Sequence, residues 1–157
     1  AGLAKSAEVL VGSSRTVIAF VLTGIVGNLA TVGVHVVFGG SVGMSAGASG
    51  GILGVMGLLI GVLLRRGNPA WKNIAMNAVF YAVLFGFAVN SASTNIKINN
   101  AAHIGGLLSG IALGLLWYRR EAIDSPLTRG FSGALFALSA VSVVLSLFSE
   151  DVFDLAG

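Results

Sequence analysis

Ala101-Ala102-His103-Ile104-Gly105-Gly106 opens one apolar, glycine-spaced segment of this chain, and Gly47-Ala48-Ser49-Gly50 stands at the start of another. Each segment is long enough to enter a lipid bilayer, where a polar side chain is costly unless it is paired or functional. A serine and a histidine are together the smallest set for nucleophilic catalysis, because the imidazole takes the proton that activates the hydroxyl. The two stretches therefore predict a helical membrane fold and a candidate site within it.

The composition is that of a polytopic membrane protein. Of the 157 residues, 55% are hydrophobic and 10% are charged, whereas soluble domains carry about 25% charged residues. The absence of cysteine excludes disulfides, thiolate catalysis and cysteine-ligated metals. The two histidines and six acidic residues lack ligand spacing, so we expect no metal and no other cofactor. The basic residues are few and lie in short loops, which disfavours nucleic acid as a partner.

Five apolar segments predict an all-α bundle of about five transmembrane helices. They run approximately over residues 16–38, 49–64, 69–89, 101–118 and 131–148. A membrane helix needs about 20 residues, so the second segment is short, as expected for a helix that begins below the membrane surface. The linkers are short and no soluble domain is visible, so residues 1–157 are expected to form a single membrane domain.

The distribution of Lys and Arg predicts the orientation. With five spans, one side of the membrane receives eight basic residues and the other side receives Lys97 alone. Since basic loops stay in the cytoplasm, the N-terminus is expected there, in the plasma (inner) membrane of a prokaryote. The eight residues are Lys5, Arg15, Arg65, Arg66, Lys72, Arg119, Arg120 and Arg129.

Ser49 and His103 are predicted to lie at nearly the same depth. Ser49 precedes Leu64 by 15 residues and His103 precedes Leu116 by 13, so at about 1.5 Å per residue both stand roughly 20 Å above the inner edge of the apolar layer. Small residues and a lone histidine also occur in ordinary helix packing. The matched depth, the glycines and the Ser–His pair together favour catalysis over packing.

Two further polar residues of the first segment have simpler interpretations. His35, near the outer end of that segment, is interpreted as a solvated interfacial residue rather than a catalytic one. Asn28 lies within the segment, and we expect its amide to donate an interhelical hydrogen bond.

The motifs resemble those of the rhomboid family of intramembrane serine proteases, and the resemblance covers nearly the whole chain. The stretch 47–50 is similar to the nucleophile motif that opens the family's fourth core helix, and the stretch 100–110 is similar to the sixth core helix, which carries the base. The resemblance implies that Ser49 is the nucleophile and His103 the general base.

The glycine spacing and the resemblance together predict roles for four glycines and a class of substrate. Gly106 and Gly110 follow His103 by three and seven residues on one helix face, which predicts that they pack the two helices, and the resemblance implies that Gly47 and Gly50 support the nucleophile motif and the oxyanion site. The expected substrates are single-span transmembrane proteins in the lipid bilayer, cleaved near the outer membrane face without a cofactor.

The family's first two core helices, of which the second helps to form the oxyanion hole, have no counterpart in this sequence. One explanation is a separate N-terminal portion that supplies them, and we favour it because both dyad motifs are retained. The alternative is a non-catalytic rhomboid-like protein that binds or routes membrane helices. A channel or transporter is disfavoured, because charge within the membrane segments is nearly absent.

Overall fold

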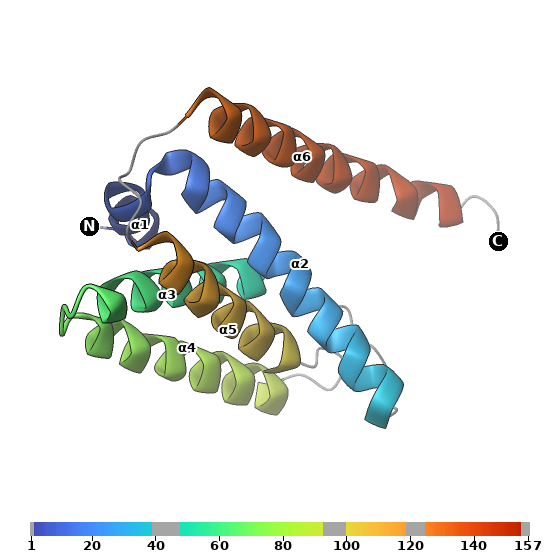
Figure 1. The fold of residues 1–157 in the computed structure, drawn as a ribbon. Helices are drawn as coiled ribbons and strands as arrows, with labels where there is room; N and C mark the ends of the chain where they lie inside the picture. Colours follow the sequence, from blue (N-terminus) through green and yellow to red (C-terminus); the bar gives the residue numbers. More distant parts are fainter. Residues whose placement is uncertain (1, 39–47, 93–99, 119–124, 155–157) are drawn as a thin grey trace.

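The computed structural model describes residues 2–38, 48–92, 100–118 and 125–154, and within these ranges it contains helices and no strand. The five long helices cover the five apolar segments of the sequence, so the predicted all-α membrane bundle is confirmed. In chain order the helices are α1 (Leu3–Val11), α2 (Ser13–Phe38), α3 (Ala48–Arg65), α4 (Trp71–Ala92), α5 (Asn100–Trp117) and α6 (Pro126–Asp154) (Figure 1).

Three helices in the described part of the chain are long and apolar enough to cross a membrane. They are Ser13–Val37, Ala48–Arg65 and Asn100–Trp117. The last two have 18 residues each, which at about 1.5 Å per residue gives a length close to the thickness of the apolar layer.

Helix α3 is the centre of the bundle. Between residues 50 and 63 every side chain or glycine except Ile52 is buried, because α1, α2, α4 and α5 all pack against this helix. Two apolar clusters fill the contacts. One joins Val55, Leu58, Leu59 and Val62 of α3 with α1 and α2, and the other joins Leu53, Met56 and Ile60 of α3 with Ala78 of α4.

The outward faces of the surrounding helices are apolar. Large hydrophobic side chains are exposed along α2, α4 and α6, among them Leu29, Val36, Met76, Val83 and Leu138. Such a surface is unfavourable in water and suits a bilayer, whose hydrocarbon covers it. Helix α6 packs on α2 and diverges from it toward the C-terminal end, outside the bundle (Figure 1).

The short helix α1 was not predicted as a separate element. It is amphipathic: Ala7 and Val11 are buried, whereas Lys5 and Glu8 are exposed. Gly12 ends this helix with a φ of 92°, a backbone angle that residues other than glycine rarely adopt. This turn sends the chain directly into α2.

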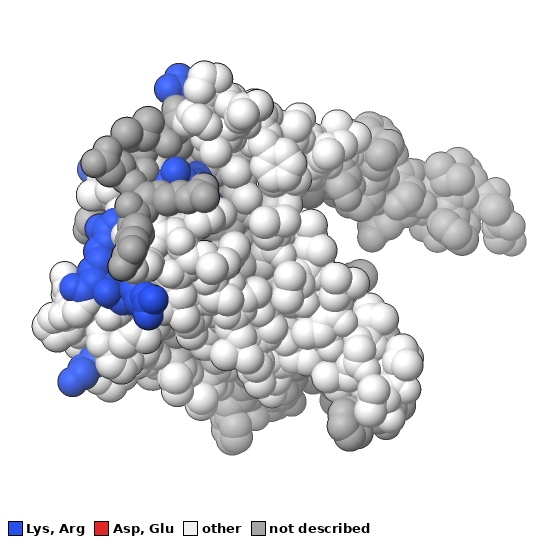
Figure 2. All heavy atoms as spheres, viewed as in Figure 1, with Lys and Arg blue, Asp and Glu red and all other residues white. Residues whose placement is uncertain are grey.

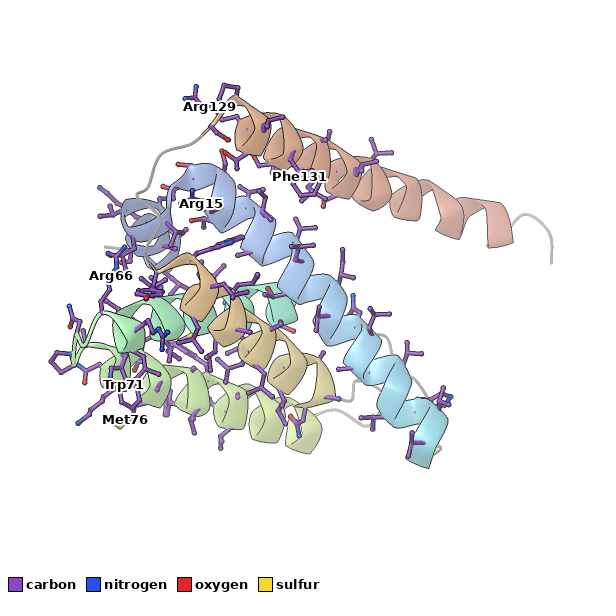
Figure 3. All side chains as sticks on the ribbon, in the orientation of Figure 1. Arg15, Arg66, Trp71, Met76, Arg129 and Phe131 are labelled. Atoms are coloured by element: carbon purple, nitrogen blue, oxygen red, sulfur yellow. The ribbon has the colours of Figure 1, made fainter. Side chains whose placement is uncertain are left out.

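The Lys and Arg residues that the structure describes lie at one end of the bundle. Figure 2 shows Lys and Arg side chains at the end of the bundle where α1, the end of α3 and the start of α4 lie, with Arg129 at the start of α6 (Figure 3). Lys97, Arg119 and Arg120 lie outside the described residues, and the orientation in the membrane stays a prediction.

Candidate active site

Ser49 and His103 meet in the structure. Ser49 is the second residue of α3 and His103 the fourth residue of α5, and Nε2 of His103 lies 3.0 Å from Oγ of Ser49. That distance is within the range required of a general base and the hydroxyl it deprotonates. Both residues lie in the first turn of parallel helices, which places them at the same depth, as the sequence predicted.

Glycines allow the close approach of α3 and α5. A Cβ atom added at Gly106 would collide with the carbonyl oxygen of Gly50, and one added at Gly110 would collide with that of Gly54. Contacts of the same kind continue toward the C-terminal ends of the two helices, where Gly57, Gly61 and Gly114 meet backbone atoms of the partner helix. The two main chains therefore touch directly, and this contact holds the serine within reach of the histidine.

Helix α2 supports the same region from the other side. A Cβ atom at Gly27 would lie 2.6 Å from the carbonyl oxygen of Ala102, next to His103. A Cβ atom at Gly105 would lie 2.8 Å from Cβ of Ala30. Because these positions also lack side chains, α5 is held between two neighbouring backbones at the level of the Ser–His pair.

The imidazole of His103 is buried, with 7% of its surface exposed. Its Nδ1 atom has no hydrogen-bond partner in the part of the chain that the structure describes. When Nε2 accepts the serine proton in a neutral imidazole, Nδ1 carries the other hydrogen. The described residues thus contain a Ser–His dyad without a third group that orients the ring.

The other residues predicted for the site have different positions. Gly50 lies beside the dyad, whereas Gly47 lies outside the described residues. His35 is half-buried in the last turn of α2. Asn28 is exposed on α2, and its amide makes no hydrogen bond within the described residues, so the predicted interhelical bond is not formed there. Its position on the outward side of the helix is the physical reason.

Thr23 is a structural residue of this region that was not predicted. It is fully buried, and its Oγ1 donates to the carbonyl oxygen of Ala19 at 2.7 Å. Its side chain fills the space above Gly54, where a Cβ atom would collide with it. The available signal was a threonine within an apolar helix, because its hydroxyl can bond a backbone carbonyl oxygen of the preceding turn.

The described residues contain no group of three or more His, Cys, Asp or Glu side chains that could hold a metal ion. The chemistry that the described side chains offer at this site is that of an activated hydroxyl.

Comparison with known proteins places the chain in a family. The family model of the Rhomboid domain matches residues 2–120. Rhomboid protease GluP of Bacillus subtilis (strain 168) is 35% identical over 140 residues, which cover 87% of this chain and 24% of that protein. RHOMBOID-like protein 6, mitochondrial, of Arabidopsis thaliana is 36% identical over 88 residues, which cover 50% of this chain and 28% of that protein.

The chain thus spans about a quarter of the length of these two curated relatives. No solved structure matches it significantly. The match of the family model over most of the chain and the identity to a rhomboid protease lead to one conclusion: the chain belongs to the rhomboid family and is an integral membrane protein.

Proposed function

We propose that this chain carries the catalytic dyad of an intramembrane serine endopeptidase, with Ser49 as nucleophile and His103 as general base. The observation that supports the proposal most directly is the 3.0 Å contact between Nε2 of His103 and Oγ of Ser49. A hydrogen bond of this kind between a buried histidine and a serine is the arrangement that activates a hydroxyl for attack.

The reaction follows from this geometry. Oγ of Ser49 attacks the carbonyl carbon of the scissile peptide bond while Nε2 of His103 takes the hydroxyl proton. The same nitrogen then gives the proton to the leaving amine, which departs and leaves an acyl-enzyme on Ser49. A water molecule, deprotonated by His103, attacks the acyl carbon and regenerates the serine.

The start of α3 is suited to bind the oxyanion of this reaction. The first turn of a helix presents backbone N–H groups that have no carbonyl partner within the helix, and its positive dipole end favours negative charge. The N–H of Gly50, next to Ser49, belongs to this turn. We propose that Gly50 and the preceding Gly47 keep this turn open to the developing oxyanion.

One position beside Ser49 is open on the surface of α3. Ile52, one turn after Ser49, is 51% exposed although the other residues of α3 from Gly50 to Leu63 are buried. We propose that this opening beside the dyad faces further helices supplied by an N-terminal portion. Residues 1–157 would then form the C-terminal five helices of one rhomboid-like membrane domain.

The proposed substrates are single-span transmembrane proteins, which the rhomboid proteases cleave within the bilayer. The dyad lies at the starts of α3 and α5 (Figure 1), opposite the end of the bundle that carries the described basic residues (Figure 2). With the basic end in the cytoplasm, cleavage would occur near the outer face of a prokaryotic plasma membrane.

Labelling with a fluorophosphonate serine-hydrolase probe tests the proposal. We expect the detergent-purified chain to be labelled, and Ser49→Ala and His103→Ala to lose the label. Ser109→Ala is the matched serine control, because Ser109 lies on α5 but donates to the carbonyl oxygens of Gly105 and Gly106 at 2.8 and 3.0 Å. His35→Ala is the histidine control.

Labelling that persists in Ser49→Ala contradicts the assignment of the nucleophile. A chain that is unlabelled both alone and together with upstream sequence contradicts the proposed activity. That outcome favours the alternative function, a non-catalytic protein that binds or routes membrane helices.

A further inference from the structure

The basic end of the bundle holds four exposed cations that form no ion pair with an acidic residue in the described part of the chain. Lys5, Arg65, Arg66 and Lys72 are all exposed, and none of them forms an ion pair with a described residue. Helices α1 and α4 begin next to Lys5 and Lys72, and neither helix has an acidic residue in its first turn. Four like charges on one surface repel one another unless an anion is bound.

Helix packing places these four residues at the same end of the bundle. Leu3 of α1 and Trp71 of α4 pack against the same apolar cluster, so the helix starts that carry Lys5 and Lys72 lie at the same end of the bundle. Arg65 and Arg66 end α3, just before the turn that leads to α4. Figure 2 shows basic side chains spread over this end of the bundle, some of them in one continuous patch.

The two arginines are held in place by neighbouring helix ends. Nε and Nη2 of Arg66 donate to the carbonyl oxygens of Tyr118 and Leu10, at 3.2 and 3.4 Å. The guanidinium carbon of Arg65 lies 5.1 Å from the centre of the Tyr118 ring. A cation stacked on an aromatic face keeps its N–H groups directed outward along the ring plane, where they can donate to another group.

Aromatic side chains mark the level of these cations in the membrane. Trp71 and Tyr118 are half-buried at the helix ends beside them, and Figure 3 shows Trp71 and Arg66 at the same end of the bundle. Tryptophan and tyrosine are enriched at the level of lipid headgroups. The four cations therefore lie where phosphate groups of the bilayer are present at high local concentration.

We propose that Lys5, Arg65, Arg66 and Lys72 form a binding site for the phosphate headgroup of anionic phospholipids. The lysines act as mobile point charges, and the stacked arginine supplies oriented donors. The site requires negative charge on the lipid, since a zwitterionic headgroup brings its own cation close to the phosphate. Anionic lipid at this site would hold the starts of α1 and α4 to the end of α3.

Native mass spectrometry of the purified chain tests this site directly. The chain is released from micelles that contain equal amounts of phosphatidylglycerol and phosphatidylcholine with identical acyl chains. We expect the wild type to retain phosphatidylglycerol selectively. Each basic residue close to a bound anionic headgroup contributes about fivefold in affinity for that lipid, so Lys5→Gln/Lys72→Gln should lower retention roughly 25-fold.

Two variants serve as controls. Lys5→Arg/Lys72→Arg keeps both charges and should retain phosphatidylglycerol like the wild type. Arg129→Gln removes one charge at the start of α6, away from the four residues, and should also retain it. Circular dichroism of each variant confirms that the helices are intact.

Equal retention of the two lipids by the wild type overturns the proposal. Unchanged selectivity in the folded Lys5→Gln/Lys72→Gln variant overturns it as well. Neither result depends on peptidase activity, so the lipid site stands or fails independently of the proposed catalytic function.

Discussion

At the scale of single residues, the Ser49–His103 hydrogen bond links stability to chemistry. His103 is buried and its Nδ1 has no partner among the described residues, so loss of Ser49 leaves the whole imidazole without a described partner. A buried polar group without a partner is destabilising.

The pair was predictable from sequence because both residues open glycine-rich segments at matched depth. The outward position of Asn28 was not predictable, because it depends on which face of α2 packs against the bundle.

A double-mutant cycle measures the energy of this bond. We expect Ser49→Ala and His103→Ala to be coupled by about 1 kcal/mol in the free energy of unfolding in detergent. The control cycle combines Ser109→Ala with His103→Ala, and it should show no coupling because Ser109 bonds its own helix. Additive effects in the Ser49 cycle would mean that the bond is not formed in solution.

At the scale of helices, the contact between α3 and α5 determines the geometry of the site. A Cβ atom at Gly110 would collide with backbone atoms of Gly54. Gly110→Ala should therefore lower the free energy of unfolding by about 1–3 kcal/mol. A shift of about 1 Å between reacting groups costs roughly a hundredfold in rate, so the variant should also lose most probe labelling.

The control for Gly110→Ala is Gly33→Ala. A Cβ atom at Gly33 meets no atom within 4 Å, and alanine favours the helix by up to about 1 kcal/mol. This variant should be at least as stable as the wild type and should be labelled normally. Equal destabilisation of the two variants would show that the loss of stability comes from replacing a glycine anywhere in these helices, and not from the contact between α3 and α5.

Some elements could be predicted from periodicity and others could not. The glycines that follow His103 at helical spacing indicated a packing face, and Gly106 and Gly110 do lie against α3. Helix α1 was missed because its nine residues carry both Lys5 and Glu8 and are too short for a membrane span. The burial of α3 on all sides is a property of four neighbouring helices, which no local pattern contains.

At the scale of the whole molecule, Arg66 connects three helices at the basic end. It follows α3 directly and donates to backbone carbonyl oxygens at the ends of α1 and α5. Arg66→Gln should lower the free energy of unfolding by about 1 kcal/mol. Arg66→Lys should not restore it, because one ammonium cannot span the two acceptors as a guanidinium does.

Thermal unfolding in detergent free of anionic lipid checks this prediction. Lys72→Gln is the matched control, because Lys72 is exposed and forms no ion pair with a described residue. If the two variants unfold at the same temperature, the bonds of Arg66 do not connect the helices.

The contact between α3 and α5 consists largely of main chain, and glycine has no rotamers to lose when it becomes ordered. An interface of long side chains loosens as those side chains change rotamer, but this interface has few that can do so. The separation of Ser49 and His103 is therefore as stiff as the two backbones that carry them. Any movement that admits a peptide must then occur in the helices around this pair, while the pair itself stays fixed.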